Sequence, residues 1–142
     1  MPELIAPTTH LHHAWLDAHT EWGPGAHEDG FGLTPADDVY SQADFTTWVE
    51  RLTRDAHATY RWIVEDDRVL GGIALRHSFD DYVMWAGHIG FGIRPTARRR
   101  GHATWALGRM LNQARVRGLD RVLVVCATDN VASAKTIRDA TG

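Results

Sequence analysis

One stretch of the chain restricts the possible folds more than any other: an apolar strand, a basic turn and an amphipathic helix follow one another over residues 87–117. The residues before Arg94-Pro95 are mostly apolar, as in a buried strand. From Gly101 onwards, apolar residues recur at helical spacing until Gly118, a residue type that commonly ends helices. Four arginines fall in the seven residues from 94 to 100. The segment therefore predicts a strand-to-helix turn with a high local positive charge.

A turn of this kind is suited to binding phosphate. The first N–H groups of a helix have no partner within the helix, and the helix dipole adds positive charge at the same end. Anions bind at such termini, and arginine side chains add paired donors. Gly101 allows the backbone to approach a ligand closely, and the small Ala103 allows the helix start to pack tightly. Charge alone leaves open the alternative of a solvated basic helix start.

Two amphipathic helices are predicted before this segment. Apolar residues recur at steps of three and four from Leu11 to Trp22, where Gly23-Pro24-Gly25 predicts the end of the first helix. A second apolar stripe runs from Phe45 to Ala56. The candidate caps are Thr8 or Thr9 for the first helix and Ser41 or Asp44 for the second.

The pattern then changes to the alternation expected of strands. Residues 60–65 and 69–76 lie on either side of Asp66-Asp67, which predicts a hairpin with a tight turn. Gly71-Gly72, inside the second of these strands, predicts a β-bulge or a close approach between backbones. A short apolar run at residues 4–6 is a candidate first strand.

The order of these elements predicts an α/β fold in which helices and a mixed sheet form separate layers. Residues 121–126 are apolar and β-branched and predict a further buried strand, parallel to residues 87–93 through a right-handed crossover. Residues 130–141 predict a last short helix. A chain of 142 residues is expected to form one domain.

Composition argues against several classes of protein. The net charge of −3 gives no general attraction for nucleic acids or anionic membranes, and the arginines lie in one turn without an aromatic stacking platform. The single cysteine, Cys126, precludes an internal disulfide and fits a reducing compartment. We expect neither a signal peptide nor a membrane span, and hence a cytoplasmic protein. The histidines at residues 10, 12, 13, 19 and 27 lack the spacing of a metal site, so none is expected.

The arginine-rich segment resembles the acyl-CoA motif of the GNAT acetyltransferases, in which Arg or Gln, two residues, Gly, one residue and then Gly or Ala follow a strand. The match here is Arg98-x-x-Gly101-x-Ala103. Asn130-Val131-Ala132-Ser133 is similar to the family's Asn-x-x-Ser/Ala element, although Asn130 could instead simply cap the last helix. Together the matches cover about residues 61–142.

The resemblance implies a GNAT-like mixed, mostly antiparallel sheet flanked by helices. The family fold continues with two further strands for which this sequence has no room. We therefore expect a single acetyl-CoA-binding acetyltransferase domain over residues 1–142 that is truncated at its C-terminus. The alternatives are that a partner chain supplies the two strands, or that the fold is a reduced form with an exposed sheet edge, and both would favour a homodimer.

The resemblance also implies an activity. A primary amine attacks the thioester of acetyl-CoA directly in a ternary complex, so the implied function is an acetyl-CoA-dependent N-acetyltransferase. The alternative is a non-catalytic acyl-CoA-binding or interaction module with a degenerate acetyltransferase fold. The implied cofactor contacts are Phe91, Gly92, Ile93 and Asn130 with pantetheine, Arg99, Arg100, Gly101, His102, Ala103 and Thr104 with pyrophosphate, and Arg98 and Ser133 as the remaining residues of the two motifs.

The catalytic groups are less sharply defined. The tyrosine that many relatives use as an acid corresponds to Ile137, so acid catalysis by tyrosine is not expected at that position. His88, on the strand before the motif, is the nearest candidate for a general base. Glu21, Glu28 and Asp29 lie where relatives shape the acceptor pocket, and Glu21 is the second catalytic candidate because its charge would suit a cationic amine. The acceptor itself is not identified by the sequence.

Overall fold

The computed structural model describes residues 1–23, 31–34, 37–77 and 88–118. The predicted strand at 121–126 and the predicted last helix at 130–141 lie outside the described residues. So do individual residues that the sequence singled out, namely Glu28, Asp29, Cys126, Asn130, Ser133 and Ile137. The roles expected of these residues remain predictions.

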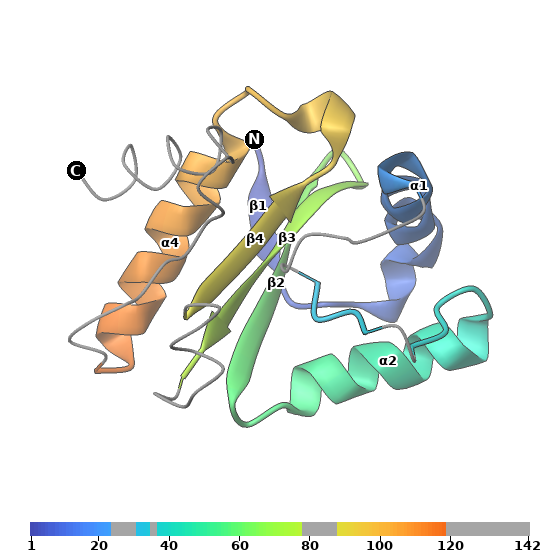
Figure 1. Cartoon of the computed structure of the whole chain (residues 1–142), viewed down its shortest axis with the longest axis horizontal. Coiled ribbons are helices and arrows are strands. Elements are labelled where there is room, and N and C mark those ends of the chain that lie inside the picture. Colours follow the sequence, from blue (N-terminus) through green and yellow to red (C-terminus); the bar gives the residue numbers. More distant parts are fainter. Residues whose placement is uncertain (24–30, 35–36, 78–87, 119–142) are drawn as a thin grey trace.

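Two helices, a hairpin, a further strand and a helix follow one another in the described part of the chain, in the order that the sequence predicted. The described strands are β1 (Glu3–Ile5), β2 (Ala58–Glu65), β3 (Arg68–Arg76) and β4 (Ile89–Ile93), the helices are α1 (His12–Trp22), α2 (Gln42–Arg54) and α4 (His102–Val116), and two short 3-10 helices are η1 (Thr9–Leu11) and η2 (Pro95–Ala97). The sheet has the order β1-β2-β3-β4 with antiparallel pairing at each step. Helices α1 and α2 cover one face, and α4 covers the other (Figure 1). The predicted layered, mostly antiparallel fold is confirmed.

The helix boundaries follow local capping chemistry. The Ser41 hydroxyl accepts a hydrogen bond from the Asp44 N–H at 3.1 Å and caps α2. Thr8 caps η1 by accepting from the His10 N–H at 3.3 Å, so the first predicted helix begins with a 3-10 turn before α1. Gly23 follows α1 with a φ of 80°, which glycine adopts without strain. None of the described helices is long and apolar enough to cross a membrane.

The β2–β3 hairpin has the tight turn and both irregularities that the sequence suggested. Asp66-Asp67 takes positive φ angles, as in the two-residue turns typical of hairpins. The pairing with β2 skips Leu70, which is therefore the extra residue of a bulge. A Cβ on Gly71 would collide with the carbonyl oxygen of Gly92 on β4. Strands β3 and β4 thus approach each other closely near the end of β4.

The two faces of the sheet carry different cores. Successive residues of β2 point to opposite faces, so Trp62 packs under α1 and α2 while Ile63 packs under α4, and both are fully buried. The first core is largely aromatic and the second largely aliphatic. The aromatic core includes Trp15, Phe45, Trp48 and Trp62, and the aliphatic core includes Ile63, Ile73, Leu75, Ile89, Leu107 and Met110.

Candidate functional site

The predicted phosphate-binding segment forms a compact turn between β4 and α4, called here the arginine turn (residues 94–101). Pro95 opens η2, where a missing N–H removes no helical hydrogen bond. Arg99 and Gly101 then take left-handed φ angles of 64° and 81°. Gly101 is the N-cap of α4, which begins at His102. The turn therefore needs glycine, or a strained residue, at the position where the helix starts.

The N-terminus of α4 has the features of an anion site. Gly101 makes no side-chain capping bond, and no acidic residue lies in the first turn of the helix. A Cβ built on Gly101 would meet no atom within 4 Å, so the space beside it is open. Arg99 and Arg100 are exposed next to this space. The first N–H groups of α4, on residues 102–104, can therefore donate hydrogen bonds to a bound anion, and the side chains of Arg99 and Arg100 add positive charge.

Arg98, the first residue of the predicted motif, helps to shape the turn. Its Nε donates a hydrogen bond of 2.8 Å to the carbonyl oxygen of Ile93. The preceding residue, Ala97, is buried against the aliphatic core. Both contacts fold the arginine turn back onto the end of β4.

Arg94 is buried in an ion-pair network with α1 that the sequence analysis missed. Its side chain is only 3% exposed. Its Nη2 donates to Asp17 Oδ2 at 2.8 Å and to Glu21 Oε1 at 2.9 Å, and its Nη1 donates to Val69 O at 3.3 Å. Asp17 and Glu21 are four residues apart and so share one face of α1. This spacing is the sequence signal from which a carboxylate pair facing an arginine could have been suspected.

Glu21 joins that network to the arginine turn. Its carboxylate accepts hydrogen bonds from the Thr96 N–H at 2.9 Å and from the Thr96 hydroxyl at 2.8 Å. Burial alone would raise the pKa of Glu21, but hydrogen bonds from Arg94 and Thr96 outweigh it and lower the pKa from 4.5 to about 2. Such a carboxylate is a poor proton acceptor near neutral pH. The catalytic role expected of Glu21 stays a prediction, and the contacts show this carboxylate as a hydrogen-bond acceptor for Arg94 and Thr96.

The predicted pantetheine contacts lie along β4, the last strand of the described sheet. Its residues pair with β3 on one side, and no strand among the described residues pairs with the other edge. The resemblance places the pantetheine arm at that edge. The residues concerned are Phe91, which is half-buried, and Gly92 and Ile93, which are buried.

His88 lies at the end of β4 opposite the arginine turn. It is fully buried, and its carbonyl oxygen accepts a hydrogen bond from the Arg76 N–H at 2.6 Å. Burial, and then the charge of Arg76, lower the pKa of His88 below its usual value of 6.5. The imidazole is therefore neutral near pH 7, which is the state a general base requires. Along an extended strand, it is on the order of 17 Å from Ile93.

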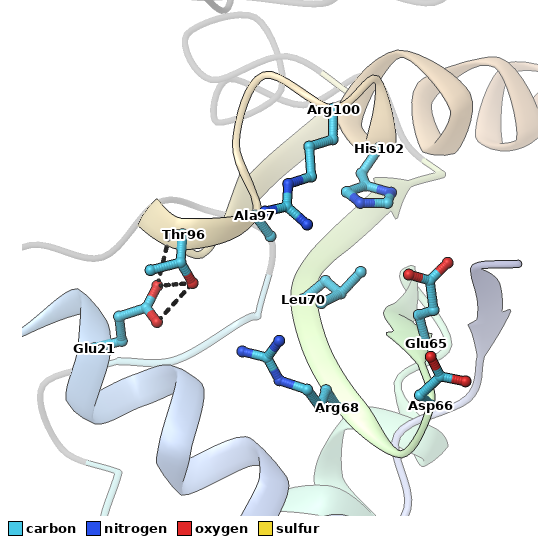
Figure 2. A pocket seen from close by; sticks show the side chains of 9 residues that line it. All are labelled: Glu21, Glu65, Asp66, Arg68, Leu70, Thr96, Ala97, Arg100 and His102. Atoms are coloured by element: carbon cyan, nitrogen blue, oxygen red, sulfur yellow. Dashed lines mark hydrogen bonds between the residues drawn. The ribbon is translucent and has the colours of Figure 1, made fainter.

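A cavity of about 290 Å³ lies between the arginine turn and the β2–β3 turn (Figure 2). Arg100 points into it from the arginine turn and His102 from the start of α4, and Glu21 and Thr96 line it as well. The opposite side carries charges of both signs, from Arg68, Glu65 and Asp66. Two of the predicted cofactor contacts thus line a cavity of mixed charge.

Two histidines of α1, His12 and His19, have hydrogen-bond partners in the protein. His12 Nε2 lies 2.8 Å from Val39 O, and His19 Nε2 lies 3.3 Å from Tyr40 Oη. Across the described ranges, no group of three or more His, Cys, Asp or Glu side chains is placed to hold a metal ion.

Comparison with known proteins gives a clear family match. The model of the acetyltransferase (GNAT) domain matches residues 10–140. No curated protein matches the chain significantly.

Solved structures share the fold over nearly the whole chain. A Vibrio cholerae protein assigned as a ribosomal-protein-serine acetyltransferase has a TM-score of 0.68 at 17% identity, and the match covers 99% of this chain and 78% of that one. An N-acetyltransferase from Staphylococcus aureus Mu50 has a TM-score of 0.66 at 16% identity, with 97% and 81% covered. The microcin C7 self-immunity acetyltransferase MccE, solved with acetyl-CoA and AMP, has a TM-score of 0.63 at 13% identity, with 99% and 77% covered.

The family match and the geometry agree. The match includes β2, β3, β4 and α4, and the arginine turn with its glycine cap lies inside it. At such low identities the solved structures show only that the fold is shared. The family model covers well over half of the chain and therefore shows the family. The chain therefore belongs to the GNAT family of acetyltransferases.

Proposed function

We propose that this chain binds acetyl-CoA and transfers its acetyl group to a primary amine, which attacks directly in a ternary complex. The observation that carries the proposal is the open N-terminus of α4 at Gly101, which the arginine turn joins to the last strand of the described sheet. Family membership supports it, and the related MccE fold was solved with acetyl-CoA.

The residues of the turn fit the pyrophosphate of the cofactor. Backbone N–H groups of residues 99–104 and the dipole of α4 supply donors and positive charge. The exposed side chains of Arg99 and Arg100 can add charge-assisted hydrogen bonds. Asn130, as a contact of the pantetheine arm, and Ser133, as the last residue of the same motif, complete the proposed set and lie outside the described residues.

Acetyl-CoA supplies an activated acyl group when bound, and the protein must manage charge and protons around it. The attacking amine has to lose a proton, and His88 is the proposed base because its imidazole is neutral near pH 7. A backbone N–H among residues 91–93, aimed at the thioester oxygen, would stabilise the negative charge that develops there.

Replacement of Gly101 by valine tests the cofactor site. Valine is strained at a φ of 81° and would place a branched side chain in the open space beside the turn. If the side chain displaces the pyrophosphate from two N–H groups at the start of α4, the loss of two hydrogen bonds of about 1.5–3 kcal/mol each would weaken acetyl-CoA binding by roughly 100-fold or more. Titration calorimetry measures the Kd.

Gly108→Ala is the matched control. Gly108 lies within α4, and a Cβ there would also meet no atom within 4 Å. Because alanine favours a helix by about 1 kcal/mol over glycine, this variant should be at least as stable and bind acetyl-CoA unchanged. Full affinity in Gly101→Val would contradict the placement of the pyrophosphate.

Release of free CoA in the presence of a panel of amines tests catalysis. The panel includes peptides that begin with serine, because the Vibrio cholerae relative is assigned to a ribosomal-protein serine, and small aliphatic amines. Release with at least one acceptor supports the proposal. Binding of acetyl-CoA without release from any acceptor favours the non-catalytic binding module.

A further inference from the structure

One carboxylate connects α1 to the arginine turn. Glu21 lies in the last turn of α1, and its oxygens accept hydrogen bonds from both Thr96 and Arg94; Figure 2 shows the contacts with Thr96. The side chain of Glu21 is 20% exposed and that of Arg94 3% exposed. The hydrogen bonds between Glu21 and Arg94 are thus part-buried, where charge-assisted hydrogen bonds are strong, whereas those between Glu21 and Thr96 lie at the exposed surface.

These bonds fix the entry to the turn from two directions. The Arg94 N–H donates to Leu70 O at 2.7 Å, and its guanidinium donates to Val69 O, so Arg94 is held against β3. The Thr96 N–H is held against α1 by Glu21 at 2.9 Å. The backbone is therefore constrained on both sides of Pro95, before it reaches the left-handed residues that lead into α4.

Asp17 provides an internal comparison. It also pairs with Arg94, at 2.8 Å, but its side chain is 66% exposed. Its bond goes to the guanidinium, whereas Glu21 also binds the backbone of the turn at Thr96. Neutralising either carboxylate removes one negative charge beside Arg94. Only the change at Glu21 also weakens a hydrogen bond to the backbone of the arginine turn, at Thr96.

We propose that Glu21 is a positioning residue for cofactor binding: it holds Arg94 and Thr96 so that the arginine turn presents the N-terminus of α4 to the pyrophosphate of acetyl-CoA. The inference rests on the proposed function. In this proposal Glu21 acts through the turn, and its side chain lines the same cavity as Arg100 and His102. Small displacements, on the order of 1 Å, are enough to weaken an anion site built from fixed backbone donors.

The test compares Glu21→Gln with Asp17→Asn, each of which replaces a carboxylate by an amide of the same shape. For Glu21→Gln, the Kd and KM for acetyl-CoA should rise on the order of 10-fold, because charge-assisted hydrogen bonds become neutral ones. The KM for the amine and the kcat at saturating acetyl-CoA should change by no more than about 2-fold, as expected when only cofactor binding is affected. Asp17→Asn should raise the KM for acetyl-CoA less than Glu21→Gln does.

Thr96→Val keeps the pair between Glu21 and Arg94 and removes only the threonine hydroxyl, so it decides the question if Glu21→Gln fails to fold. It should raise the KM for acetyl-CoA in the same direction, by a smaller factor. Unchanged affinity in every folded variant of Glu21 and Thr96 would overturn the positioning role and leave the proposed function standing. A fall in kcat with an unchanged KM for acetyl-CoA would overturn it too, because Glu21 would then act in the chemical step. If the unaltered protein fails to bind acetyl-CoA at millimolar concentration, the proposed function is lost, and this inference with it.

Discussion

The pKa of a buried titratable side chain is shifted in opposite directions at the two ends of β4. Arg94, after the strand, keeps its charge: burial would lower its pKa, but hydrogen bonds and charges of Glu21 and Asp17 raise it. His88, before the strand, favours its neutral form, because burial and the nearby Arg76 lower its pKa. One end therefore carries an ion-pair network and the other a neutral imidazole.

This difference matches the two tasks of the proposed reaction. An anion site needs backbone donors in fixed positions, and a well hydrogen-bonded ion pair can hold them there. Proton transfer needs a base that is neutral near the working pH. Changes at the Arg94 end should therefore affect stability and cofactor binding, and changes at the His88 end should affect the dependence on pH.

The largest effect on stability is expected for Arg94→Ala. The change leaves Glu21 without its buried counter-charge and leaves the carbonyl of Val69 without a donor. Removing one partner of a buried pair costs about 3–5 kcal/mol. Because water can solvate the exposed Asp17 after the change, we expect a loss of about 3 kcal/mol in the free energy of unfolding. Urea unfolding measures the change in the free energy of unfolding.

Arg100→Ala is the control for that experiment, because it removes the same side chain from an exposed position in the same turn. Its free energy of unfolding should stay within about 0.5 kcal/mol of the unaltered protein. Equal losses in the two variants would show that the buried network adds nothing beyond a surface arginine.

The fold around the site could be predicted because its signals are local. The alternation at 60–65, the helical spacing after Gly101 and the pair Gly71-Gly72 each depend on residues close together in the chain, and the structure confirms all three. The first helix differs at its start, where the cap at Thr8 closes a 3-10 turn instead of α1 itself. Whether the first turn is a 3-10 turn or an α-helical turn depends on hydrogen-bond geometry, which the spacing of apolar residues does not indicate.

The Arg94 network could not be predicted with the same means. Its partners, Glu21 and Asp17, lie 73 and 77 residues away in the chain. Acidic residues on an amphipathic helix usually face solvent, and so do arginines in a basic run. Only the packing of α1 beside the end of β4 reveals that these charges meet. The same packing explains why Glu21, expected as a catalytic group, has the surroundings of an anchor.

A second experiment separates the two ends of β4 by pH. The folded protein lowers the pKa of Glu21 from 4.5 to about 2, so its charged form stabilises the fold. That stabilisation is present above pH 4.5 and is lost as the pH falls towards 2. Glu21→Gln should therefore be less stable than the unaltered protein at pH 6, and the difference should shrink below pH 4.5. Urea unfolding at a series of pH values checks this, and a constant difference down to pH 3 would contradict the assigned pKa.

An effect on the pH dependence of stability is expected at the other end, for His88→Gln. Because the pKa of His88 is lowered, its neutral form favours the fold; this contribution is present above pH 6.5 and is lost as the pH falls below it. Glutamine keeps a polar side chain but does not titrate. The variant should therefore lose the part of the acid sensitivity that begins near pH 6.5 and keep the part, due to Glu21, that begins near pH 4.5.

The same variant tests His88 as the base, with a half-buried second histidine, His77, as the control for replacing a histidine whose pKa is lowered. His77, at 2.8 Å from Thr59 Oγ1, also has its pKa lowered, by burial and by the charge of Arg117. If His88 accepts the proton of the amine, the acidic limb of the pH profile of kcat/KM should disappear in His88→Gln and persist in His77→Gln. The reverse result would move the base from β4 to the end of β3, and the two ends of β4 would then differ in stability alone.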